Sequence, residues 1–305
     1  MNRTRLIAPV ALAAAALVLA GCSTDASDAS GPAKSGSLNV VASTDVWGSV
    51  ASAIGGDHVK VTSIIDDPDK DPHEYQADAR NQLAISKANV VISNGGGYDD
   101  FVSTMVKASK KHPTTLVAAD ISGYDQHPSE GDFNEHLWYD FPTVKKVADQ
   151  LADSFAKADP AAADDFHANA TSFDGKLADL EATEAHLKSE HAGTAVTITE
   201  PVPVYMLDAI GLKNVTPEKF SEAIENDTDV APTVLKQTLD LYSSGRVKLL
   251  AYNEQTTGPQ TEAVLKAAKQ NNVAVVPVTE TLPTGKNYIE WMTANLDAIG
   301  SALGD

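Results

Sequence analysis

Short apolar segments alternate with helical segments along most of the chain, and this alternation constrains the fold more than any other feature. In the first half, runs rich in Val and Ile occupy residues 37–43, 59–65, 88–94 and 114–120. Segments of helical composition separate these runs, at residues 46–56, 76–87 and 98–111. Strands that alternate with helices in this way form βαβ units and a mostly parallel sheet.

The same alternation returns after residue 190. Apolar runs at 193–200, 247–254 and 272–280 are combined with helical segments at 233–244 and 260–271. The chain has 305 residues, of which 43% are hydrophobic, and this is sufficient for two cores of ordinary size. The sequence therefore predicts an α/β protein of two lobes, residues 38–158 and 191–305, each with a mostly parallel sheet.

A segment of a different kind, residues 159–190, separates the two lobes. Asp159 and Pro160 are typical of a helix N-cap and first helical residue. Steps of three, four and seven then connect the apolar residues Phe166, Ala170, Phe173, Leu177, Leu180 and Leu187. This spacing keeps one face of a helix apolar. Such a helix either lies on the surface of one domain or connects the lobes over about 45 Å, and we favour the connection.

The N-terminus predicts export. Arg3 and Arg5 precede the uncharged stretch 6–20, which is too short to span a bilayer comfortably, and no later apolar run is long enough for a transmembrane helix. The stretch leads into Leu-Ala-Gly-Cys22, which resembles a bacterial lipobox. The resemblance implies removal of residues 1–21 and lipidation of Cys22, the only cysteine. The alternative is an ordinary signal peptide with an incidental cysteine.

Residues 22–37 are rich in Ser, Ala, Asp and Gly and contain no large apolar residue before Leu38. They cannot bury enough surface to offset chain entropy, so we expect a flexible tether. The folded part would then be attached to the outer face of the cytoplasmic membrane.

The charge excludes one class of partner. The chain has 42 acidic residues and 23 Lys and Arg residues, for a formal net charge of −19. Because nucleic-acid binding needs clustered cations, we expect no nucleic-acid partner. An acidic surface also suits a protein that attracts cations.

Polar residues stand where the predicted strands end. In open parallel sheets, ligands bind beyond the carboxyl ends of the strands. The runs 193–200 and 272–280 end in Glu200 and Glu280, and His73 lies in a proline-flanked loop after the strand 59–65. A charged group at the end of a buried strand needs a partner or solvent. These positions therefore indicate a ligand-binding cleft.

His136 lies in the segment FNEHLWYDFP, residues 133–142. Taken alone, it is a metal ligand, a catalytic base or an ordinary residue of an aromatic patch. Trp138 would shield it from solvent, and Asp140 would either orient groups behind it or cap the next helix. Asp45 and Trp47 follow the first strand and either line the cleft or simply begin a helix.

Four segments together resemble a known family, at residues 71–99, 135–142, 197–212 and 275–292. They look like successive motifs of the metal-specific solute-binding lipoproteins of bacterial ABC importers, the cluster A-I receptors for zinc or manganese. The resemblance runs in order from about residue 38 to the C-terminus. It implies two α/β lobes joined by one long helix, with a metal site in the cleft between the lobes.

The resemblance also implies one ligand from each motif. His73 matches the first ligand and His136 the second. Glu200 matches the third, where the family has His or Glu, and Glu280 the fourth, where Asp is more usual. Two neutral imidazoles and two carboxylates offset the charge of a divalent ion. Geometry and availability would decide between the two metals, and the affinity order favours zinc slightly, with manganese next.

The function that this resemblance implies is capture of a divalent metal ion, Zn²⁺ or Mn²⁺, and its delivery to an ABC permease with its ATPase. The ion would be the transported ligand, so we expect no catalytic cofactor and no enzyme, and we expect a monomer. Cell adhesion is associated with some family members, and nothing in this sequence bears on it.

Two functions are alternatives to metal capture for transport. The first is a membrane-anchored metallohydrolase, but the sequence has no HExxH or GxSxG motif. Four protein ligands would also leave no open position for water. The second is a receptor for an organic or chelated-metal solute, for which a metal-free aromatic cleft would be expected.

Overall fold

The computed structural model describes residues 37–305 with the exception of residues 68–74, 77 and 130. Its strands are β1 (Leu38–Thr44), β2 (Val59–Ile65), β3 (Val90–Ser93), β4 (Thr114–Val117), β5 (Ala195–Ile198), β6 (Lys213–Asn214), β7 (Leu249–Asn253) and β8 (Ala274–Val278). The predictions for residues 1–36, including lipidation of Cys22, and for His73 lie outside the described residues.

The helices alternate with the strands as the sequence predicts. They are α1 (Asp45–Gly55), α2 (Ala79–Lys87), α3 (Asp100–Ala108), α4 (Ala118–Ser122), α5 (Phe141–Ala158), α6 (Ala163–His191), α7 (Val204–Ala209), α8 (Glu218–Glu225), α9 (Pro232–Ser243), α10 (Pro259–Gln270) and α11 (Tyr288–Leu303). Short 3₁₀ helices are η1 (Gly56–His58), η2 (Leu137–Tyr139) and η3 (Pro160–Ala162).

The two sheets have the same topology. The first has the order β2-β1-β3-β4 and the second the order β6-β5-β7-β8, and all neighbouring strands are parallel. In each sheet the direction of strand addition reverses, between β1 and β3 and between β5 and β7. A crevice for ligands opens at such a switch point, beyond the carboxyl ends of the strands. The predicted fold class, two mostly parallel α/β sheets with one long helix, is confirmed.

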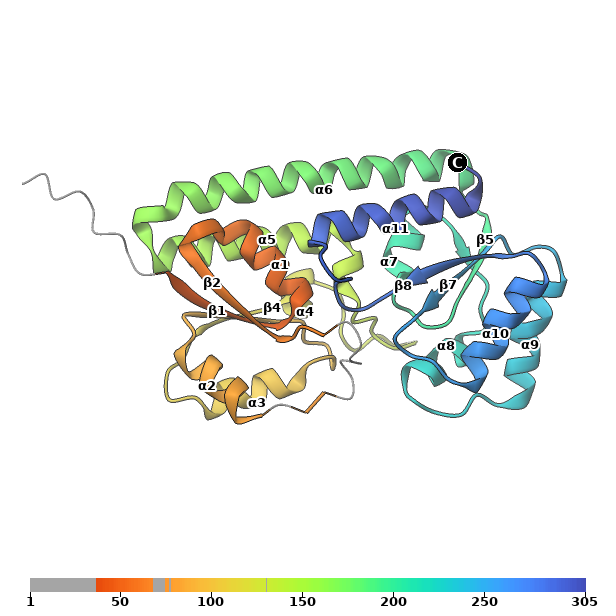
Figure 1. Ribbon diagram of the computed structural model, residues 1–305, viewed down its shortest axis with the longest axis horizontal. Coiled ribbons are helices and arrows are strands. Elements are labelled where there is room, and N and C mark those ends of the chain that lie inside the picture. Colours follow the sequence, from red (N-terminus) through yellow and green to blue (C-terminus); the bar gives the residue numbers. More distant parts are fainter. Residues whose placement is uncertain (1–36, 68–74, 77, 130) are drawn as a thin grey trace, which may run out of the picture. The chain divides into compact units, whose positions relative to one another are not determined.

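Helices cover both faces of each sheet (Figure 1). In β1, Val40 and Ala42 pack into a large core with residues of α1 and α5, whereas Val41 packs with residues of α2 and α3 on the other face. In β7, Leu249 faces that same large core, and Leu250 packs with residues of α8, α9 and α10. This burial on both faces explains why the strands appear in the sequence as continuous apolar runs.

Helix α6 contains 29 residues and joins the two sheets, as predicted. Its buried residues follow alternating steps of four and three: Phe166, Ala170, Phe173, Leu177, Leu180, Glu184 and Leu187. This is the spacing of a helix that packs along a single seam. Helix α6 contacts α1 and α5 of the first half and α7 and α11 of the second (Figure 1). One position of the seam is occupied by a carboxyl group, that of Glu184.

Several predicted strands are longer than the observed ones. Of the predicted strand 114–120, only Thr114–Val117 is a strand, because helix α4 begins at Ala118. The backbone N–H of Ala119 in this helix bonds to the carbonyl of Asn94. Strand β5 likewise ends at Ile198, so Glu200 stands in the loop after the strand. In the described ranges, no helix combines the length and the apolar character needed to cross a membrane.

Candidate metal centre

His136 is enclosed in the protein interior. It immediately precedes η2, and its side chain is fully buried. The Asn134 Oδ1 atom accepts a hydrogen bond from the His136 backbone N–H at 3.1 Å and lies 2.8 Å from its Nδ1 atom. With Nδ1 bonded to Asn134, Nε2 is the ring nitrogen that can bind an ion. An outer hydrogen bond of this kind fixes the orientation of a metal-binding imidazole.

Two carboxylates face the Nε2 atom of His136. The Glu225 Oε1 atom lies 3.7 Å from it and the Glu280 Oε2 atom 3.8 Å from it. Within the described residues, Nε2 makes no hydrogen bond. These separations are slightly larger than the distance between two donors that share an ion with bonds of about 2.0–2.2 Å. The three side chains therefore have the arrangement of donors around a small cation.

Glu280 is held by neighbours from both halves of the chain. Its Oε1 atom accepts a hydrogen bond from the Asn253 side chain at 2.9 Å, and its Oε2 atom accepts one from the Tyr98 hydroxyl at 3.2 Å. Its backbone N–H donates to the side chain of Gln255. Only 1% of its surface is exposed. The sequence places this carboxylate after β8, and the structure brings it to His136.

Glu200 is buried beside the other carboxylates. Its exposed fraction is 4%, and its Oε2 atom has no hydrogen-bond partner within the described part of the chain. Burial first, and then the charges of Glu280 and Glu225, raise the pKa of Glu200 to about 8. Hydrogen bonds from Asn253 and Thr256 oppose this shift. Carboxylates that repel one another in a buried space are stabilised by a shared cation.

Glu225 is a site residue that the sequence analysis misses. It is the last residue of α8, and 12% of its side chain is exposed. Glu218 and Glu222 precede it in the same short helix, and such a run of acids usually marks a solvated face. Its proximity to His136 depends on the packing of α8 against the second sheet, which no local pattern predicts.

The charges around His136 act against one another. Burial lowers the pKa of His136, but the negative charges of Glu225 and Glu280 outweigh burial and raise the pKa to about 9. Without an ion, the imidazole therefore holds a proton that neutralises part of the carboxylate charge. A metal ion must displace that proton, since only the neutral imidazole binds metal.

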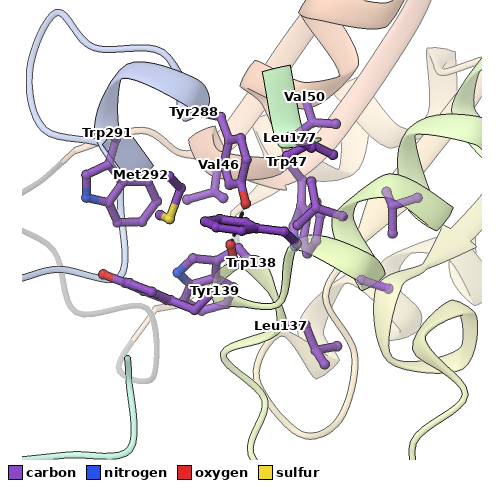
Figure 2. Packing of buried hydrophobic residues seen from close by; sticks show 14 of the residues in the cluster. Val46, Trp47, Val50, Leu137, Trp138, Tyr139, Leu177, Tyr288, Trp291 and Met292 are labelled. Atoms are coloured by element: carbon purple, nitrogen blue, oxygen red, sulfur yellow. Dashed lines mark hydrogen bonds between the residues drawn. The ribbon is translucent and has the colours of Figure 1, made fainter. Parts of the chain in front are cut away.

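Aromatic side chains enclose the donors. The rings of His136 and Trp138 lie 5.2 Å apart in an edge-to-face arrangement, and Tyr98 lies 5.0 Å from Trp138. Figure 2 shows Trp138 and Tyr139 packed with Tyr288 and residues of α1. The Tyr288 hydroxyl donates a 2.6 Å hydrogen bond to the Trp138 carbonyl, so α11 of the second half fixes the segment that carries His136.

The remaining predicted residues have different surroundings. Trp47 is fully buried, and its Nε1–H donates to Asn94 at 3.1 Å. Asp45 accepts a hydrogen bond from the backbone N–H of Leu282, and burial raises its pKa to about 6. Asp140 accepts hydrogen bonds from the backbone N–H and the hydroxyl of Thr143, so its side chain caps α5. None of these hydrogen bonds of Trp47, Asp45 and Asp140 involves His136, Glu200 or Glu280.

A cavity of about 940 Å³ lies next to the carboxylate cluster. Of the described residues in its wall, six are acidic and none is Lys or Arg; the acidic ones are Asp100, Asp132, Glu135, Glu218, Glu222 and Glu225. Charge of one sign along a concave wall raises the local concentration of counter-ions. The cavity therefore attracts cations, and Glu135 and Glu225 of its wall lie close to His136.

Donor atoms of Glu135, His136 and Glu225 lie within 4.8 Å of one another. This group overlaps the predicted ligand set at His136, whereas Glu200 and Glu280 lie outside the group. Carboxylate oxygens and one imidazole nitrogen suit divalent ions such as Mn²⁺ and Zn²⁺. The described part of the site can hold a cation, and its charges favour one.

Comparisons with known proteins agree with this chemistry. Residues 40–302 match the family described as zinc-uptake complex component A, periplasmic. The chain is 28% identical to the manganese-binding lipoprotein MntA of Bacillus subtilis, over 86% of this chain and 84% of the relative. It is 24% identical to the manganese ABC transporter substrate-binding lipoprotein scaA of Streptococcus gordonii, over 99% of both chains.

Solved structures show the same fold. A crystal structure of ZnuA superposes with a TM-score of 0.70 at 18% identity, covering 88% of this chain and 98% of that chain. Because the family match extends over most of the chain, the assignment does not depend on any single motif. The chain belongs to the zinc-uptake complex component A family of metal-binding proteins.

Proposed function

We propose that this protein is an extracytoplasmic receptor that captures a divalent transition metal and delivers it to an ABC permease. The observation that carries the proposal is the buried Nε2 atom of His136, which faces Glu225 and Glu280 at 3.7 and 3.8 Å. The names of the relatives support the same function, since they describe manganese-binding and substrate-binding lipoproteins of transporters.

We propose His73, His136, Glu200 and Glu280 as ligands of the transported ion. The burial of the last three and the charge repulsion that raises the pKa of Glu200 support this set. His73 lies outside the described residues, and its place in the set depends on the motif around it. The ion is Zn²⁺ or Mn²⁺: imidazole suits zinc, and a carboxylate-rich site suits manganese.

The partners and the anchor follow from the family. Receptors of ABC importers act with a permease and its ATPase, and we propose both as partners of a monomeric protein. Lipid attached to Cys22 would hold the folded part, residues 38–305, at the outer face of the membrane. Within it we place lobes at 38–158 and 191–305, on either side of the helix 159–190. The relatives are transporter components, so we infer no catalytic reaction.

The test is metal titration by calorimetry with Zn²⁺ and with Mn²⁺. We expect His136→Ala and His73→Ala each to lower the affinity at least a hundredfold, because each removes a direct ligand. His112→Ala is the matched control, since this exposed histidine is remote in sequence from every proposed ligand. Unchanged affinity in both ligand variants would overturn the assignment. Cys22→Ala should release the protein from membranes, and continued lipid labelling of that variant would exclude the anchor.

A further inference from the structure

Glu135 and Glu225 form a second group of donors around His136, on the side of the acidic cavity. Both residues line that cavity, whereas His136, Glu200 and Glu280 do not. The donor atoms of Glu135, His136 and Glu225 all lie within 4.8 Å of one another. The carboxylates of the site thus fall into two sets, an inner set of Glu200 and Glu280, which are buried outside the cavity wall, and a cavity-side set of Glu135 and Glu225, which line it.

The His136 imidazole adds a nitrogen donor to the two carboxylates of the cavity-side set. Its Nε2 atom is fully buried, has no hydrogen-bond partner within the described residues, and lies 3.7 Å from Glu225. The backbone fixes Glu135 beside it: the Glu135 carbonyl accepts a hydrogen bond from the Asn94 side chain at 2.9 Å. A cation between these side chains would have two carboxylates and one nitrogen as donors.

An ion would approach Glu135 and Glu225 from the cavity that they line. The cavity's other acidic residues, Asp100, Asp132, Glu218 and Glu222, continue the negative charge away from Glu225. An ion that moves along this wall meets Glu135 and Glu225 before it meets the inner carboxylates. Oxygen donors at the wall also allow a partly hydrated ion to exchange its waters stepwise, which a fully enclosed site cannot do.

We propose that Glu135, His136 and Glu225 form a capture position, which a divalent ion occupies on its way between the acidic cavity and the inner ligands. The proposal rests on the proposed function, because it assumes that a metal ion is the cargo. His136 belongs to both positions and transfers the ion from one set of carboxylates to the other. The cavity-side carboxylates therefore control the rate of exchange more than the final affinity.

The test is stopped-flow fluorescence with Mn²⁺ and with Zn²⁺, in which Trp138, 5.2 Å from His136, reports binding. We expect Glu225→Gln to slow association at least tenfold and to slow dissociation into a chelator as well, so that the equilibrium affinity changes less than the association rate. The matched control is Glu218→Gln. It removes the same charge from the same cavity wall away from His136, and it should slow association less than threefold.

Two results would overturn the capture position: an association rate in Glu225→Gln no lower than in Glu218→Gln, or faster dissociation of the bound ion in Glu225→Gln. The second result would mean that Glu225 holds the ion in its final position. Failure of the proposed function looks different, because the unaltered protein would then bind neither ion. Circular dichroism of each variant establishes that the fold is retained.

Discussion

Glu184 is the one charged residue in the buried seam of α6, and its replacement tests how the long helix is held. The residue is 7% exposed, and it follows Leu177 and Leu180 at the heptad spacing. Burial first, and then the charges of Glu181 and Asp140, raise the pKa of Glu184 to about 8 from its usual 4.5, while Lys188 opposes the shift. At neutral pH the folded protein therefore keeps this carboxyl group mostly protonated.

The sign of the effect on stability follows from this raised pKa. Between pH 4.5 and about 8 the folded state binds a proton that the unfolded state has lost, so stability falls as the pH rises. The stabilisation is fully present below pH 4.5 and is lost as the pH passes through 8. At about 1.4 kcal/mol for each pH unit, the loss is at most about 5 kcal/mol, and relaxation of the site reduces it to about 2–3 kcal/mol.

The variant Glu184→Gln has the shape of the protonated side chain but cannot ionise. We expect it to be as stable as the unaltered protein at pH 5 and about 2–3 kcal/mol more stable at pH 9, measured by urea denaturation of the metal-free protein. The control Asp179→Asn removes an exposed charge from the same helix and should change stability by less than about 0.5 kcal/mol at either pH. A difference between Glu184→Gln and the unaltered protein that does not depend on pH would refute the reasoning.

Three further predictions concern the support of the metal centre. Asn134→Ala removes the acceptor that orients His136, so metal affinity should fall at least tenfold in calorimetry; unchanged affinity would show that Asn134 does not position the ring. Tyr288→Phe leaves the Trp138 carbonyl without its buried donor and should cost about 1–2 kcal/mol in urea denaturation, and an unchanged midpoint would contradict that cost. Asp140→Ala should cost about 1 kcal/mol through loss of the α5 cap while metal affinity stays constant; weaker metal binding would instead give Asp140 a role behind His136.

Regular patterns in the sequence predict much of the fold. Strand β2 is predicted with its observed bounds, Val59–Ile65, because its β-branched run ends in an acidic loop. The seam of α6 is predicted except for Glu184, since a charged residue interrupts the apolar pattern while the helix continues to pack. The ends of β4 and β5 are not predicted: helix α4 replaces the strand from Ala118, and β5 ends at Ile198 although the Thr199 N–H still bonds to the Ala251 carbonyl.

The candidate site likewise contains residues that the sequence predicts and one that it does not. His136 and Glu280 are predicted from strand ends and motifs, and the structure places them 3.8 Å apart. Glu225 is not predicted, because its helix has the acidic composition of a solvated surface and reaches the site only through packing in three dimensions. Motifs identify residues that share a local pattern, whereas a side chain that converges from a distant helix has no pattern of its own.

The continuous core beneath α6 has a consequence for how the molecule responds to its cargo. Residues of both sheets, such as Val40 and Leu249, belong to one hydrophobic cluster, and α6 packs on helices of both halves. We therefore expect the two halves to unfold together. A cargo ion at a thousand times its dissociation constant adds about 4 kcal/mol to the folded state. Amide hydrogens at both ends of α6 should then exchange about a thousandfold more slowly, the factor that corresponds to 4 kcal/mol. Binding of the ion would therefore stabilise α6 along its whole length.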